Sequence, residues 1–255
     1  MMKNGIFPLV MIVSLLFTAC ASEPYRNEEK LKEASKYNAD LGLAYLRQGR
    51  NAIAMTKLSK AIEQNEDNAE AHHYIAELYR RLGKMEESEK HFKKALELTP
   101  NDSMLQNNYG VFLCQQEKYK EARVLFLTVL NDPLYKAKWQ VYENIGLCAK
   151  LKGDVKTAGK YLHKALRANP RAAKSYLALA QINFDNQDYA AARKYYYKYL
   201  EFGRQNPASL WLGILLERRS GNHERVASYS VLLKGKFPDS KEAALLRKME
   251  ARARR

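Results

Sequence analysis

The clearest unit in the chain is residues 69–100, which read AEAHHYIAELYRRLGKMEESEKHFKKALELTP. Apolar residues recur at helical spacing on both sides of Gly83, which predicts two amphipathic helices joined by a tight turn. Pro100 closes the unit, because proline cannot supply the backbone donor that another helical turn needs. The stretch therefore predicts a helix-turn-helix unit.

The same pattern recurs along most of the chain. Small residues at Gly42, Ala76, Gly110, Gly146 and Ala180 lie 34, 34, 36 and 34 positions apart. Further series keep this register, which indicates one supersecondary unit copied along the chain. They are a second small series at Ala54, Ser88, Ala122, Ala158 and Ala192, a bulky series at Leu58, Phe92, Phe126, Leu162 and Tyr196, and turn glycines at Gly49, Gly83, Gly153 and Gly221.

The repeated unit matches a known pattern best at Ile75-Ala76, Tyr79, Gly83, Phe92 and Pro100. In these residues it resembles the tetratricopeptide repeat, which implies helix pairs that stack into a superhelix. We predict an all-α fold, a tetratricopeptide-repeat superhelix with a basic C-terminal capping helix at residues 241–255. The six repeats are placed at residues 35–68, 69–102, 103–138, 139–172, 173–206 and 207–240.

The sixth repeat departs from the pattern. Val226 replaces its small residue and Ser230 its bulky residue, and Leu212-Gly213 is out of register. Terminal repeats are often atypical because one face meets solvent. We therefore keep residues 207–240 as a repeat and expect the following helix to cap the array.

The N-terminus indicates export. Residues 6–17 are apolar apart from Ser14, but a bilayer-spanning helix needs about 20 such residues. Phe17-Thr18-Ala19-Cys20 resembles a bacterial lipobox, which implies removal of residues 1–19 as a signal peptide and acylation of Cys20. Ala21 then implies sorting to the outer membrane, on its periplasmic face, with residues 20–34 as lipidated N-terminus and tether. The alternative is an ordinary secreted protein with an incidental cysteine.

Composition narrows the class of partner. The chain has 43 Lys and Arg against 28 Asp and Glu, a net charge of +15, and 46% hydrophobic residues. This balance excludes a disordered chain and an integral membrane protein. The positive charge permits nucleic acid, anionic lipid or an acidic protein surface. Export places cytoplasmic nucleic acid out of reach, so we expect no nucleic-acid partner.

No catalytic constellation is evident in the sequence. The five histidines show no metal-ligand spacing, and we interpret them as solvated helix residues. There is no Gly-rich phosphate loop and no nucleophile motif. We predict a non-enzyme with no cofactor, no metal and no small-molecule substrate.

A tetratricopeptide array implies a concave groove lined by its first helices. The mixture of residues at the groove positions suits a peptide or an amphipathic helix, although some of the apolar ones could belong to the core. The candidate groove residues are His73, Glu77, Arg80, Arg81, Asn107, Val111, Gln115, Glu143, Leu147, Lys150, Leu177, Gln181 and Phe184.

Two cysteines remain besides Cys20. Cys114 and Cys148 are 34 positions apart in the first helices of adjacent repeats, and such helices pack side by side. A disulfide between Cα atoms within ~7 Å is therefore feasible, and an oxidising periplasm would preserve it. By closing the loop between the two cysteines, the bond would contribute roughly 3–4 kcal/mol to the stability of the fold. The alternative is a pair of buried free thiols.

Particular strings carry a closer resemblance that covers essentially the full length. They are residues 107–114, residues 142–148, residues 187–196 and residues 209–214, reading NNYGVFLC, YENIGLC, QDYAAARKYY and SLWLGI. With the lipobox and the repeats, they resemble the PilF/PilW family of type IV pilus biogenesis lipoproteins. The resemblance implies a pilotin, which binds the type IV pilus secretin and promotes its outer-membrane localisation and multimer assembly. We expect it to act as a monomer.

An alternative shares the lipobox and the repeats. It is a helical-repeat lipoprotein of another outer-membrane assembly machine, of the type that supports β-barrel insertion. A pull-down with the intact lipoprotein would separate the two, since secretin would be recovered in one case and barrel-assembly subunits in the other.

Overall fold

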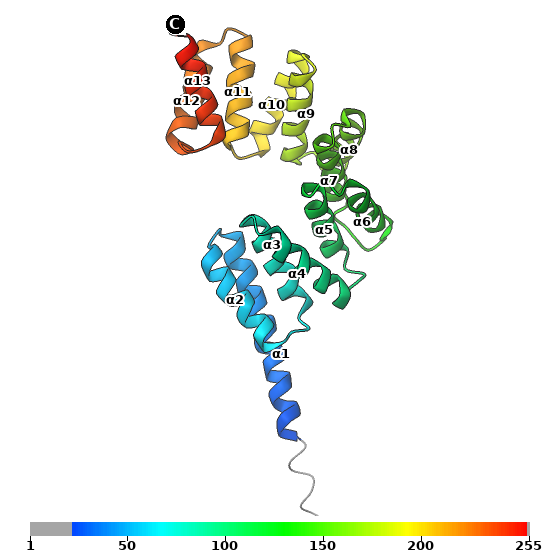
Figure 1. The fold of residues 1–255 in the computed structure, drawn as a ribbon. Helices are drawn as coiled ribbons and strands as arrows, with labels where there is room; N and C mark the ends of the chain where they lie inside the picture. Colours follow the sequence, from blue (N-terminus) through cyan, green and yellow to red (C-terminus); the bar gives the residue numbers. More distant parts are fainter. Residues whose placement is uncertain (1–21, 254–255) are drawn as a thin grey trace, which may run out of the picture. The chain divides into compact units, whose positions relative to one another are not determined.

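The computed structural model describes residues 22–253, and within them it contains thirteen helices and no strand (Figure 1). This confirms the predicted all-α class. The helices are α1 (Ser22–Arg47), α2 (Asn51–Gln64), α3 (Ala69–Arg81), α4 (Met85–Leu98), α5 (Ser103–Gln115), α6 (Tyr119–Asn131), α7 (Lys138–Leu151), α8 (Val155–Ala168), α9 (Ala173–Asp185), α10 (Tyr189–Phe202), α11 (Pro207–Arg219), α12 (His223–Lys236) and α13 (Lys241–Ala253).

The described part of the chain divides into two compact units, the first ending at Leu105 and the second beginning at Gln106. In the first unit α1 packs on α2 and α3 packs on α4, while α1 also contacts α3. In the second unit α7 pairs with α8, α9 with α10 and α11 with α12, and α13 packs against α11 and α12. Each unit is thus a stack of helix pairs in which first helices contact first helices.

The small and bulky series meet inside the helix pairs. A Cβ added to Gly146 would lie 2.7 Å from Cγ of Leu162, and one added to Gly42 would lie 2.5 Å from Cγ of Leu58. Real Cβ atoms are not found that close to another carbon, so the missing side chain is what lets the paired helices approach. Leu58 and Leu162 are fully buried as a result. The register read from the sequence is therefore the register of the core.

The turns between paired helices share one backbone conformation. Gly49, Gly83, Gly153 and Gly221 have φ between 73° and 85°, the left-handed region that glycine adopts without a Cβ clash. The equivalent turns after α5 and α9 place Glu117 at φ 60° and Gln187 at φ 64°. The same left-handed turn therefore forms with or without glycine.

The first helix includes most of the predicted tether. Residues 20–34 are predicted to form a lipidated N-terminus and tether, and α1 begins at Ser22 and continues to Arg47. Its first part is polar, and the Lys32 ammonium lies 2.7 Å from the Glu28 carboxylate one turn earlier, a pair that supports an exposed helix. Residues 27–34 include no buried side chain, and Ser35 is fully buried. The signal peptide and Cys20 lie outside the described residues.

Between residues 22 and 253, no helix is both long enough and apolar enough to cross a bilayer.

Candidate interaction surface

Three candidate groove residues of the first unit form ion pairs or hydrogen bonds with nearby groups of that unit. On α3 the Arg80 guanidinium lies 2.7 Å from the Glu77 carboxylate, and both side chains are mostly buried. Arg81 is exposed, and its Nη1 donates to the carbonyl oxygen of Leu46 at 2.6 Å. The carbonyl lies at the C-terminal end of α1, where helical carbonyls lack partners in their own helix, and Arg81 adds to the bond that it accepts from the backbone N–H of Gly49.

Three candidate groove residues are buried. His73 is 3% exposed, Asn107 4% and Glu143 6%, and they occupy the same position in three successive repeats. Leu177, at that position in the next repeat, is half-buried. On α5 and α7 this position faces the neighbouring first helix. Because all three side chains are buried, they are not open to a peptide.

Two of these buried residues connect repeats by hydrogen bonds. An oxygen of the Glu143 carboxylate accepts from the backbone N–H of Ser175 at 3.1 Å and from its hydroxyl at 2.8 Å, which joins α7 to α9. Asn107 accepts at Oδ1 from Nδ2 of Asn144 at 3.0 Å, which joins α5 to α7. A buried polar group without such a partner would be destabilising by about 1–3 kcal/mol.

Neither partner, Ser175 or Asn144, is among the residues predicted from the sequence. A signal for the first was present, because Ser175 and Ser209 are 34 positions apart and both are buried. Ser209 belongs to a capping box at the start of α11, in which the Asn206 side chain accepts from its backbone N–H. A signal for the second was present too, because Asn108 lies 36 positions before Asn144, at the same position of the preceding repeat.

Four of the remaining candidate groove residues in the second unit are apolar and only partly covered. Leu147, Leu177 and Phe184 are half-buried and pack against the hydrophobic cores of this unit. Phe184 meets Tyr189 edge to face, with ring centroids 5.5 Å apart. Val111 is also half-buried, so α5, α7 and α9 offer apolar side chains that are only partly covered. Lys150 on α7 is half-buried as well and carries a positive charge.

The other two positions are polar. Gln115 is exposed. Gln181 is half-buried, and its Nε2 donates to the Asp185 carboxylate at 2.7 Å one turn along α9. Polar groups beside an apolar strip give the composition expected of a peptide-binding surface.

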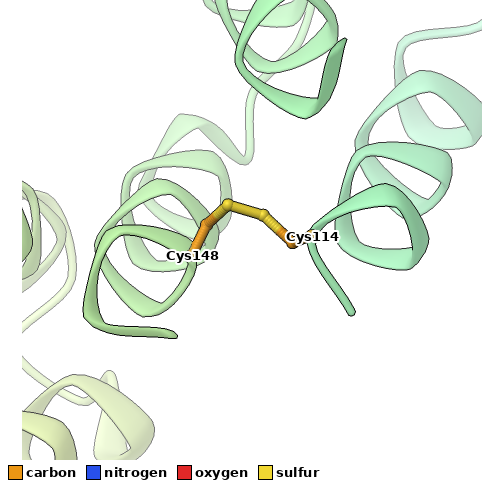
Figure 2. The surroundings of a disulfide bond; sticks show 2 residues. All are labelled: Cys114 and Cys148. Atoms are coloured by element: carbon orange, nitrogen blue, oxygen red, sulfur yellow. A yellow bond between two sulfur atoms is a disulfide. The ribbon is translucent and has the colours of Figure 1, made fainter. Parts of the chain in front are cut away.

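Cys114 on α5 and Cys148 on α7 are joined by a disulfide in the structure (Figure 2). Their Cα atoms are 5.7 Å apart, within the range that a disulfide spans without moving the backbone. Both residues are buried, at 4% and 9% exposure. Together with the Asn107 hydrogen bond, the disulfide gives α5 and α7 two side-chain connections.

The histidines of the first unit are not solvated, contrary to the interpretation from sequence. His72 and His73 on α3 are 7% and 3% exposed, and desolvation lowers the pKa of both. His91 on α4 contacts His72, and burial together with that neighbour lowers its pKa to about 4. The sequence could not reveal this, because the pairing depends on how α3 packs on α4.

These histidines are packing groups. Within residues 22–253, no three or more His, Cys, Asp or Glu side chains converge as a metal site would require. His91 instead stacks on Tyr79, with ring centroids 5.6 Å apart.

Comparison with known proteins agrees with this architecture. The tetratricopeptide repeat family matches residues 39–103 and 150–207, and a second tetratricopeptide repeat description matches residues 91–124. The type IV pilus assembly protein PilF of Pseudomonas aeruginosa is 31% identical over 238 residues, which is 92% of this chain and 94% of PilF. An uncharacterised Haemophilus influenzae protein is 31% identical over 139 residues, 54% of this chain and 77% of its own.

Solved structures extend the likeness to three dimensions. The structure of Pseudomonas aeruginosa PilF superposes with a TM-score of 0.67 at 31% identity, covering 86% of this chain and 99% of PilF. The structure of PilW, a widely conserved type IV pilus biogenesis factor, gives a TM-score of 0.69 at 26% identity, with 83% and 97% covered. The chain therefore belongs to the PilF/PilW family of type IV pilus biogenesis proteins built from tetratricopeptide repeats.

Proposed function

We propose that this protein is a pilotin, an outer-membrane lipoprotein on the periplasmic face that binds the type IV pilus secretin and promotes its multimer assembly. The observation that carries the proposal is the similarity to PilF over nearly the whole of both chains. The lipobox-like Phe17-Thr18-Ala19-Cys20 supports the anchor. In this role the protein is a non-catalytic scaffold whose partner is another protein.

The surface on α5, α7 and α9 suits such a partner. A subunit that will enter a membrane ring exposes apolar or strand-edge surface before assembly, which favours aggregation. Half-buried Leu147, Leu177 and Phe184 offer an apolar surface that could cover it. An acyl anchor at Cys20 would confine both proteins to the membrane plane and raise their effective concentration.

The test is to follow secretin multimers in the native host. We compare a strain lacking the gene, a Cys20→Ala strain and a strain in which residues 1–20 are replaced by a cleavable secretory signal. All three should lose multimers from the outer-membrane fraction and lose surface pili. Complementation with Lys120→Ala, a change at an exposed position on α6, should restore both.

The outcomes separate the proposal from its alternative. Normal secretin multimers in the outer membrane of the deletion strain would refute the pilotin role. Loss of outer-membrane β-barrels, together with pull-down of barrel-assembly subunits, would assign the protein to a β-barrel insertion machine.

A further inference from the structure

A cleft of about 610 Å³ lies between α11 and α13, at the C-terminal end of the second unit. Its apolar lining comes from Trp211 and Leu215 on α11 and from Leu245 and Met249 on α13. In each helix the two residues are four positions apart, which places them one above the other on one face. The cleft is therefore bordered by a row of apolar side chains from each helix, and its volume is comparable with that of ligand pockets.

The rest of the lining is positively charged. Arg218 continues the α11 row, and Lys248 and Arg252 continue the α13 row. All three residues are exposed. Within residues 22–253, none of the three has a carboxylate within 4.0 Å, and the lining itself includes no acidic residue. An apolar floor is thus bordered by three cations that have no ion-pair partner in that part of the chain.

The acidic residues nearest in sequence are engaged elsewhere. Glu217 is fully buried and accepts from the Tyr197 hydroxyl at 2.7 Å, on a different face of α11 from the cleft. Glu250 lies 2.9 Å from the Lys234 ammonium of α12. Neither carboxylate neutralises the cleft, so its positive charge is available to a ligand.

We propose that this cleft binds an acidic amphipathic helix of a partner protein. A third helix that packs on two helices presents apolar residues at i, i+3, i+4 and i+7, the spacing that the rows on α11 and α13 repeat. Glutamates or aspartates beside those residues would meet Arg218, Lys248 and Arg252. The site is independent of the secretin surface proposed on α5, α7 and α9, and it holds if that proposal fails.

Anionic lipid headgroups are the alternative ligand that the three cations could bind. Surfaces that enter a bilayer interface present apolar side chains outward, as an amphipathic helix does. Here the apolar groups line a concavity, and Trp211, Leu215 and Met249 are only partly exposed. That shape favours a ligand that inserts side chains between α11 and α13.

The test uses the full chain in neutral phosphatidylcholine nanodiscs and a fluorescein-labelled model helix of about four turns. The probe carries leucines at helical spacing flanked by glutamates, and a matched probe carries lysines in their place. Fluorescence anisotropy should detect binding of the acidic probe and no binding of the lysine probe. In a Trp139→Phe background the emission of Trp211, the remaining tryptophan, should shift when the acidic probe binds.

Charge reversal locates the binding site. The double variant Arg218→Glu, Lys248→Glu should bind the acidic probe at least about tenfold more weakly, and it should gain affinity for the lysine probe. The control is Lys120→Glu, Arg123→Glu, two exposed positions on α6 with the same change in net charge. It should bind the acidic probe as the parent does. Circular dichroism should show equal helix content for both variants.

Three results would overturn the proposal. One is absence of acidic-probe binding by the parent protein. Another is equal weakening in the cleft variant and the α6 control, which would mean that net charge alone attracts the probe. The third is a Trp211 emission shift caused by phosphatidylglycerol nanodiscs without any probe, which would assign the cleft to the membrane surface.

Discussion

Nδ1 of His72 lies 2.8 Å from Nδ1 of His91, which joins α3 to α4. Nε2 of His72 lies 3.0 Å from the Glu66 carbonyl oxygen, which can only accept, so this nitrogen carries a proton. Neutral His72 therefore accepts at Nδ1, and His91 donates to it. A second proton on His72 would remove that acceptor.

Acidification should therefore destabilise the first unit. Burial lowers the pKa of His91 to about 4 and also lowers the pKa of His72, so the unfolded chain binds more protons than the folded chain below pH ~6.5. The contribution of these histidines to the free energy of unfolding is fully present above that pH, and it decreases as the pH drops towards 4. After allowance for partial exposure, we expect a loss of ~1–2 kcal/mol between pH 7 and pH 5 in urea unfolding.

The histidine pair can be separated from general acid effects by substitution. His91→Gln should be less stable at pH 7 but lose less on acidification. His223→Gln, at an exposed position, should behave as the parent does. An unchanged pH dependence in His91→Gln would contradict the assignment.

The left-handed turns predict that introducing glycine at a turn that lacks it stabilises the protein, and that replacing a turn glycine destabilises it. Glu117→Gly and Gln187→Gly should each raise the free energy of unfolding by about 0.5–1 kcal/mol, because their φ values of 60° and 64° strain a residue with a Cβ. Gly83→Ala should lower it by about 1 kcal/mol. The measurement is chemical denaturation.

A glycine inside a helix supplies the control for these turns. Gly159 lies in α8, and an added Cβ would meet nothing within 4 Å. Gly159→Ala should therefore stabilise the protein, whereas Gly83→Ala destabilises it. The same sign at both positions would exclude strain at the turn as the cause.

The disulfide predicts a stability that depends on redox conditions. Reduction of the bond between Cys114 and Cys148 should lower the free energy of unfolding by ~3–4 kcal/mol, because the closed loop restricts the unfolded chain. The Cys114→Ser, Cys148→Ser variant should be insensitive to reductant. Mass spectrometry of unreduced, alkylated protein from the periplasm checks the bond directly, and two alkylated thiols would disprove it.

The close approach of Gly146 to Leu162 predicts coupled mutations. Gly146→Ala should destabilise the protein by about 1–3 kcal/mol, since the new Cβ would lie 2.7 Å from Cγ of Leu162. Leu162→Ala alone should cost about 2–5 kcal/mol through the cavity that it leaves. The double variant should lose less than the sum of the two, and strict additivity would argue against contact.

The helix pairs were predictable because small and bulky residues must alternate at a fixed period wherever two helices cross. The turn at Glu117 shows the limit of that reasoning, since it lacks the glycine signal and still adopts the same conformation. The flanking helices impose the turn there. Propensity and pairs such as Glu28 and Lys32, without an apolar stripe, account for the early start of α1.

The candidate surface was less predictable than the fold. Asn107 and Glu143 were assigned to a groove by their repeat position, but the structure buries them and pairs them with neighbouring helices. Their burial depends on how closely adjacent first helices approach. That distance is set by tertiary packing between repeats and leaves no pattern within a single repeat.

The early start of α1 also has a mechanical consequence. Residues 22–34 lead up to Ser35, which is buried, and as a helix they extend about 20 Å. A flexible strand of that length would let the repeats swivel freely about its outer end. A continuous helix acts as a lever arm, so that torque applied near Ser22 turns the first repeat with it.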